Sequence, residues 1–152
     1  MNIKKILSTA EQTCNDSGTR FTDKRKHVLS CLLESQKPLS AYDLVDDMRE
    51  RYDESLPPMS IYRILEFLES ENLVHKLSST NKFIACSHIA CEHSHQVPQF
   101  LICDRCGIVK EIGIHKDVAT SLQNSVTAAG FFLQSPQLEL HCLCSSCSTA
   151  GK

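Results

Sequence analysis

Two pairs of cysteines in this chain have the spacing of metal ligands. Cys103 and Cys106 stand three positions apart in the stretch "FLICDRCGIVKEI". Near the C-terminus, "CSSC" repeats this spacing with Cys144 and Cys147. A C-x2-C turn offers two thiolates to one ion, and four thiolates complete the closed tetrahedral shell of a structural zinc site. The pairs therefore predict a zinc clamp between two distant stretches of chain, and Gly107 allows the first turn to close tightly.

Other uses of these cysteines have less support. Unliganded core cysteines would not need two matching C-x2-C pairs. A thioredoxin-like redox pair would open a helix within a βαβ unit, and neither pair does so. The chain has nine cysteines. In a cytoplasmic protein, where thiols stay reduced, that number favours metal ligands over a disulfide framework.

Length and composition are those of a soluble globular protein. The 152 residues suit one compact domain or two small ones. No apolar run reaches the length of a membrane span, and the N-terminal "MNIKKILSTAEQTC" is too short and too polar for a signal peptide. We therefore expect a cytoplasmic protein with no membrane partner. The net charge of -2 means that nucleic-acid binding would require a local basic face.

The first half of the chain has the pattern of three helices and a hairpin. Apolar residues recur at helical spacing in segments 22–35, 40–52 and 56–73. Thr22 and Ser40 stand at N-cap positions, and Asp43 completes a capping-box pattern with Ser40. Strand-like runs at 73–77 and 81–86 flank the turn "SSTN". This order of elements predicts a winged helix.

The second half has a different pattern. Residues 87–99 are polar and rich in histidine, which indicates a hinge. Strands are expected at 99–103, 108–112 and 137–142, with Leu138 and Leu140 on one face of the last. Between them, apolar residues from Val118 to Ala129 predict a helix that ends before Gly130. We expect an α-rich half, a hinge and an α/β half.

Five motifs together carry a resemblance to a known family. They are "SAYDLV", "PPMSIYRILEFLE", "LVHKLSSTNKFIAC", "QFLICDRCGIVKEI" and "HCLCSSC". In this order, from about Phe21 to Cys147, they resemble the ferric uptake regulator superfamily and, within it, the zinc uptake regulators. The resemblance implies an α+β protein with a winged-helix DNA-binding domain at 1–84 and a metal-binding hinge at 85–98. A small α/β dimerisation domain at 99–152 would then carry the four-cysteine zinc site.

The resemblance also implies a second, sensory zinc site, and hence two Zn²⁺ per subunit. Its ligands would be His75, Cys86, Glu111 and a histidine before the "FLIC" strand. His95 is our choice for the last ligand, with His93 in reserve. A thiolate, two imidazoles and a carboxylate make a good tetrahedral zinc shell, and the sulfur favours Zn²⁺ over Fe²⁺. No role is assigned to His88, Cys91 or Cys142.

Segment 56–73 is expected to hold the recognition helix, which lies in the major groove of DNA. Arg63 falls on its outward face and suits a guanine or a phosphate. Tyr62 is either a second contact or a half-buried packing residue. The resemblance adds Tyr42, and basic side chains near Arg25 would contact phosphates.

Two further residues are candidates for a contact between neighbouring dimers. Asp46 and Arg49 match positions that pair across dimers on DNA in some zinc regulators, although an ion pair within their own helix is an equal alternative. Asp23 and Ser60 depart from the family pattern, which commonly has Pro and Thr at those positions. These departures bear on operator details rather than on the fold.

The expected function is zinc-responsive repression of zinc-uptake genes by a homodimer on double-stranded operator DNA. An iron or peroxide sensor of the same superfamily is one alternative, and Cys86 argues against it. A zinc-buffering or thiol-switch protein is another. An enzyme with a small-molecule substrate is not expected. The chain lacks HExxH and similar catalytic motifs, and both predicted metal sites have full ligand sets.

Overall fold

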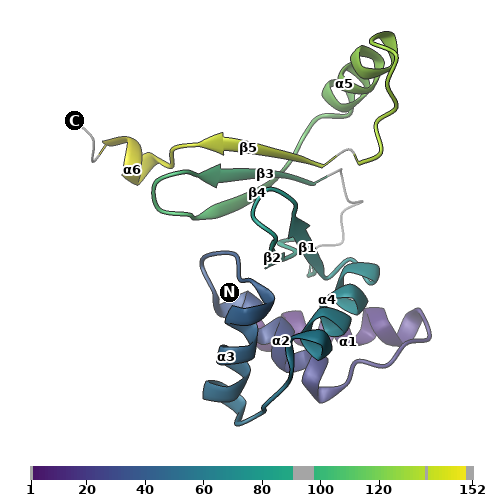
Figure 1. Cartoon of the computed structure of the whole chain (residues 1–152). Coiled ribbons are helices and arrows are strands. Elements are labelled where there is room, and N and C mark those ends of the chain that lie inside the picture. The colour runs from purple at the N-terminus through teal and green to yellow at the C-terminus, as the bar shows by residue number, and fades with distance from the viewer. Residues whose placement is uncertain (1, 91–97, 136, 150–152) are drawn as a thin grey trace. The chain divides into compact units, whose positions relative to one another are not determined.

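The computed structural model describes residues 2–90, 98–135 and 137–149, which belong to two compact units, 1–92 and 93–152. The first unit contains α1 (Ile3–Asp16), α2 (Asp23–Glu34), α3 (Ala41–Tyr52), α4 (Pro58–Ser70), β1 (Val74–Leu77) and β2 (Lys82–Ala85) (Figure 1). The second contains β3 (Pro98–Cys103), β4 (Val109–Gly113), α5 (Lys116–Ala128), β5 (Leu138–Cys142) and α6 (Ser145–Thr149). None of the helices in the described residues has the length and hydrophobicity that a membrane crossing requires.

The helices of the first unit begin where the sequence predicts. The Thr22 side chain accepts a hydrogen bond from the backbone N–H of Arg25 at the start of α2. Ser40 and Asp43 form a reciprocal capping box at the start of α3. Pro58 opens α4, where its missing N–H removes no helical hydrogen bond. The three predicted helices are confirmed.

The core of the first unit lies between α2, α3 and α4. α3 and α4 each contribute residues from one face, whereas α2 is buried on all sides from Val28 to Leu33. The following core residues are fully buried: Val28, Leu29, Leu44, Met48, Ile61, Leu65 and Leu68. The hairpin β1–β2 is antiparallel, with His75 opposite Ile84. Leu39 pairs with Phe83, and their backbones exchange two hydrogen bonds that attach the hairpin to the chain before α3. This arrangement is the predicted winged helix.

A fourth helix, α1, precedes the three that were predicted. Its apolar face buries Ala10 and Cys14 against the core of the first unit. Glu71, which follows α4, accepts hydrogen bonds from the hydroxyls of Ser17 and Thr19, at 2.7 and 3.0 Å. These contacts hold the end of α1 beside the end of α4. The expectation of three helices was therefore incomplete.

The second unit is built on a three-stranded sheet in the order β4-β3-β5. β3 pairs antiparallel with β4 and parallel with β5. α5 lies in the connection from β4 to β5. The buried residues of this unit, among those described, are all on β3: Gln99, Phe100, Ile102 and Cys103. Leu138 on β5 is half-buried and Leu140 is 43% exposed, so the apolar face predicted for that strand is only partly covered within the described chain. No residue of α5 is buried.

Candidate functional site

The sheet of the second unit brings the two cysteine pairs together. Cys103 ends β3 and lies opposite Cys142 of β5, which places Cys144 just beyond the same edge. The first pair lies in a tight turn, in which Gly107 donates to the Cys103 carbonyl at 2.9 Å with a left-handed φ of 77°. The backbone N–H of Cys144 also points at the Cys103 sulfur, at 3.4 Å.

The four sulfur atoms have the spacing of one tetrahedral shell. The Sγ atoms of the cluster lie within 4.8 Å of one another, and they belong to Cys103, Cys106, Cys144 and Cys147. The Sγ atoms of Cys106 and Cys144 are 3.8 Å apart. A tetrahedral zinc ion with Zn–S bonds of about 2.3 Å would separate its sulfur ligands by about 3.8 Å. The predicted cluster therefore fits a zinc ion in both donor type and geometry.

Local hydrogen bonds prepare one of these thiols for ionisation. Backbone N–H groups of Cys106 and Cys144 lower the pKa of Cys103 from 9.0 to about 6. The pKa of Cys147 is raised to about 12, chiefly by its hydrogen bond with the Cys144 thiol and by burial. Several thiolates at this distance repel one another, so full ionisation of the cluster calls for a cation among them.

Hydrogen bonds around the cluster also join the two stretches of chain that carry the cysteine pairs. Arg105 donates to the Cys147 carbonyl at 2.8 Å. His141 and Asp104 are paired, with Nδ1 and Oδ1 2.7 Å apart. Asp104 and Arg105 were not predicted as functional residues, although both lie inside the first C-x2-C turn. Their position between two ligands was the signal that could have identified them.

The hairpin of the first unit joins two of the predicted sensory ligands. His75 lies on β1, and Cys86 directly follows β2. A ring nitrogen of His75 and the Cys86 sulfur lie within 4.8 Å of each other. Cys86 is 4% exposed, and its sulfur accepts a hydrogen bond from the backbone N–H of His88 at 3.4 Å. The β1–β2 pairing thus creates an imidazole–thiol pair suited to a soft divalent cation.

The remaining predicted sensory ligands belong to the second unit or fall outside the described residues. Glu111 belongs to the second unit, on β4, where it is opposite Phe100. His93 and His95 fall outside the described residues. Residues 91–97 of the predicted hinge fall there too.

The predicted DNA-contacting residues occur at the starts of helices and on the surface of α4. Arg63 is exposed, and Tyr42 is 66% exposed in the first turn of α3. Tyr62 is half-buried and packs against the core of the first unit, as its alternative interpretation predicted. Asp46 and Arg49 are both exposed on α3.

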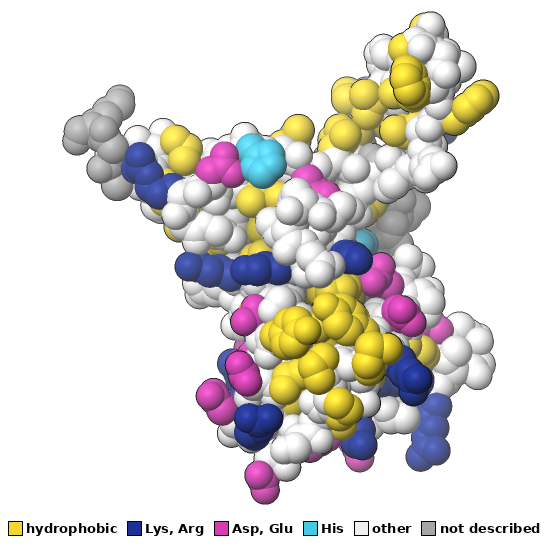
Figure 2. Space-filling model, viewed as in Figure 1, with side chains coloured by type: hydrophobic (Ala, Val, Ile, Leu, Met, Phe, Trp, Pro, Cys, Tyr) yellow, Lys and Arg dark blue, Asp and Glu magenta, His cyan; other side chains and the backbone are white. Residues whose placement is uncertain are grey.

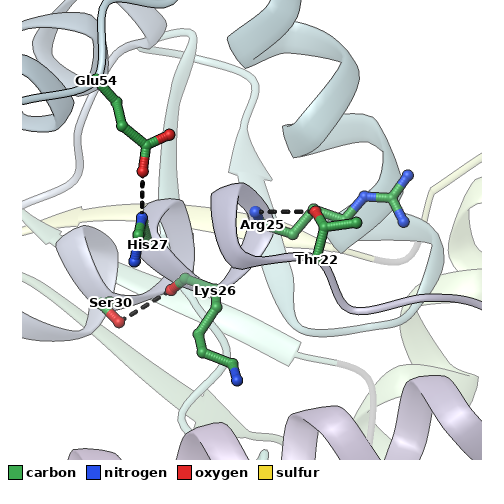
Figure 3. Close-up of polar contacts among 6 residues, drawn as sticks. All are labelled: Thr22, Arg25, Lys26, His27, Ser30 and Glu54. Atoms are coloured by element: carbon green, nitrogen blue, oxygen red, sulfur yellow. Dashed lines mark hydrogen bonds and ion pairs between the residues drawn. The ribbon is translucent and has the colours of Figure 1, made fainter. Parts of the chain in front are cut away.

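Arg25 lies at the start of α2, where its backbone N–H donates to the Thr22 side chain (Figure 3). Its guanidinium carbon lies 3.6 Å from the centroid of the Phe67 ring, and its Nη1 donates to the Arg20 carbonyl. Two positions further along α2, His27 stacks on Tyr52 and pairs with Glu54, which joins α2 to the end of α3. Lys26 lies 3.7 Å from Glu11 of α1. The basic residues in this part of α2 therefore contact neighbours on α1, α3 and α4.

Comparison with known proteins finds a family model and relatives that match most of this chain. The model of the ferric uptake regulator family matches residues 16–141. The chain is 36% identical over 144 residues to the zinc uptake regulation protein of Escherichia coli K12, covering 95% of this chain and 82% of that protein. It is 30% identical over 109 residues to the ferric uptake regulation protein of Helicobacter pylori 26695, covering 72% and 69%.

A solved structure resembles the chain over nearly its whole length. It is described as a zinc uptake regulator complexed with zinc and DNA. The match has a TM-score of 0.85 and 31% sequence identity, and it covers 99% of this chain and 98% of the other.

Proposed function

The chain belongs to the ferric uptake regulator family, and we propose that it is a zinc-responsive transcriptional repressor that binds operator DNA as a dimer. The observation that carries the zinc response is the pairing of His75 with the buried thiol of Cys86 at the base of the hairpin. A sulfur ligand favours Zn²⁺ over Fe²⁺ at such a site. The genes controlled would be those of zinc uptake, since repression under zinc sufficiency limits further import.

Each subunit would hold two zinc ions with different roles. The four-cysteine cluster is the structural site, in which a bound cation supplies the positive charge that four thiolates require. Cys103 and Cys106 hold the end of β3 in this site, and Cys144 and Cys147 hold the C-terminal segment to it. The set of ligands is complete, so this site leaves no open position for chemistry.

The second ion would occupy the sensory site. His75 and Cys86 of the first unit would bind it together with Glu111 of the second unit and His95 of the hinge. Because these ligands come from both units, ligation of one ion by all four would restrict the units to a single relative arrangement. The population would then shift toward dimers whose recognition helices match both half-sites of the operator.

The first unit would make the DNA contacts. α4 would lie in the major groove, where exposed Arg63 can donate two hydrogen bonds to a guanine. Tyr42 and Tyr62 would contact bases or backbone nearby. Arg25, held against Phe67, would contact a phosphate from the start of α2. Asp46 and Arg49 would pair with the same residues of a neighbouring dimer.

The second unit would form the dimer. α5 has no buried residue, and hydrophobic side chains gather over it in Figure 2. Val118, Phe131 and Phe132 are among the exposed large hydrophobic residues of the unit. A second copy of this unit would remove that apolar surface from water and place two recognition helices on one operator.

The similarity to a ferric uptake regulation protein favours one rival, an iron-responsive regulator. The two are separated by measuring DNA affinity against free metal. The reduced protein would select its preferred duplex from a randomised pool, and binding would then be titrated with Zn²⁺ and, without oxygen, with Fe²⁺ at fixed salt. We expect Zn²⁺ to switch binding on at lower free concentration than Fe²⁺. Tighter activation by Fe²⁺ would favour the rival.

A further inference from the structure

Two large hydrophobic side chains in the described part of the first unit are mainly exposed, and both lie in the first turn of a helix. Tyr42 of α3 is 66% exposed, and Met59 of α4 is 65% exposed. The proposed function uses Tyr42 as a DNA contact but gives no role to Met59. Packing within the first unit does not explain Met59 either, because its side chain lies outside the core.

Met59 lies on the same face of α4 as Arg63. The exposed residues of α4 follow the helical repeat, and they are Met59, Arg63, Glu66 and Ser70. The opposite row, Ile61, Leu65 and Leu68, is fully buried. Residues four apart are neighbours on a helix surface, so Met59 lies beside Arg63 on the N-terminal side. Met59 is the one apolar member of the exposed row.

This position is the one from which a recognition helix contacts base edges. The N-terminal residues of such a helix reach deepest into the major groove. In that groove thymine alone presents a methyl group, and apolar side chains recognise it. A methionine side chain is flexible and polarisable, so it can follow an irregular apolar surface. It carries no charge and adds nothing to the attraction between protein and phosphates.

We propose that Met59 is a specificity-determining residue that contacts the C5-methyl group of a thymine, next to the base contacted by Arg63. This inference rests on the proposed function, in which α4 is the recognition helix. Under this inference, one row of exposed side chains on α4 recognises DNA bases in two different ways. Arg63 recognises hydrogen-bond acceptors, and Met59 recognises a methyl group one turn away.

Deoxyuridine tests the contact because it differs from thymidine only by that methyl group. The zinc-loaded protein would select its tightest duplex from a randomised pool, and each thymine of a half-site would then be replaced singly by deoxyuridine. Dissociation constants would be measured for the wild type, Met59→Ala and Met59→Leu at several salt concentrations. Both substitutions place good helix formers at an exposed position, so the fold is expected to be retained.

For the wild type, we expect loss of one methyl contact to weaken binding about fourfold at one thymine per half-site. Met59→Ala should bind the thymidine and deoxyuridine duplexes equally there, whereas Met59→Leu should keep most of the difference. All three proteins should show the same salt dependence. If Met59→Ala still distinguishes thymidine from deoxyuridine as the wild type does, the inference is wrong while the proposed function stands. If the zinc-loaded wild type selects no sequence, the proposed function fails and this inference fails with it.

Discussion

The sulfur atoms of Cys106 and Cys144 lie 3.8 Å apart, although 38 positions separate the two residues in the chain. The parallel pairing of β3 with β5, which sets Cys103 opposite Cys142, creates this proximity. The described part of the second unit buries few residues, all on β3. A clamp between the ends of β3 and β5 would therefore supply much of the stability that a larger core would otherwise provide.

Removing one clamp ligand should release the structural zinc and loosen the second unit. We expect Cys106→Ser to bind one zinc per subunit fewer than the wild type. Binding of a structural zinc contributes about 10–16 kcal/mol of apparent folding free energy in small domains, so residues 93–152 should lose protection from hydrogen exchange. Cys142→Ser is the matched control, since Cys142 lies on β5 opposite Cys103 but is not one of the four clustered cysteines. Unchanged zinc content in Cys106→Ser would rule out this ligand set.

The buried thiol of Cys31 should make the stability of the first unit sensitive to alkaline pH. Burial raises the pKa of Cys31 from 9.0 to about 11. Below pH 9 the thiol is protonated in both the folded and the unfolded chain. Between pH 9 and 11 the unfolded chain loses the proton while the folded chain keeps it. The free energy of unfolding should therefore fall by up to about 1.4 kcal/mol per pH unit.

The comparison that isolates this effect is between the wild type and Cys31→Ala. Urea unfolding of the full chain would be followed by the helical signal at pH 8.5 and 10.5. The stability advantage of the wild type over Cys31→Ala should shrink as the pH rises. An advantage of equal size at both pH values would show that the Cys31 thiol does not titrate in this way.

Substitutions at two nearby residues of α4 should show that operator affinity and the free energy of unfolding depend on different side chains. Arg63 is exposed, so Arg63→Ala should leave the free energy of unfolding nearly unchanged. It should weaken operator binding by about 1–3 kcal/mol, provided that the guanidinium contacts a base. Leu65 is fully buried, and Leu65→Ala should lower the free energy of unfolding by about 2–5 kcal/mol. Equal operator affinity for wild type and Arg63→Ala would exclude Arg63 as a DNA contact.

The identity of the hinge ligand can be decided by paired substitutions. We expect His95→Ala to raise the free zinc concentration needed for operator binding, because the sensory shell would lose one of its four ligands. His93→Ala should respond to zinc as the wild type does. The two titrations would be run on the same duplex at the same salt. The opposite result would identify His93 as the ligand.

Local patterns in the sequence predicted most elements of the fold, because the signals that define them are short in range. The capping box of Ser40 and Asp43 and the buried stripe of α4 are contained within single helices. α1 was not predicted, although Ala10 and Cys14 lie on its one buried face and this helical spacing could have identified it. The exposed Leu140 shows the limit of alternation as evidence, since a strand can be apolar where the described chain provides nothing to cover it.

The predicted metal ligands also differ in how far the sequence alone could identify them. The four-cysteine cluster could be predicted from spacing, because each C-x2-C turn fixes two ligands locally. The pairing of His75 with Cys86 depends on the β1–β2 register, and the residues themselves gave no spacing rule for it. Only the family resemblance suggested that pair. The role proposed for Met59 rests on its exposure, which its position four residues before Arg63 on the outward face of α4 could have suggested.

The proposed sensory role of Cys86 is best tested by measuring zinc content and zinc-dependent operator binding of Cys86→Ala together. Cys14→Ala is the control, because Cys14 is also a buried thiol of the first unit but lies in the core between helices. We predict that Cys86→Ala keeps its structural zinc and its fold but no longer gains operator affinity as free zinc rises, whereas Cys14→Ala responds normally. A normal zinc response in Cys86→Ala would contradict the sensory site proposed for this protein.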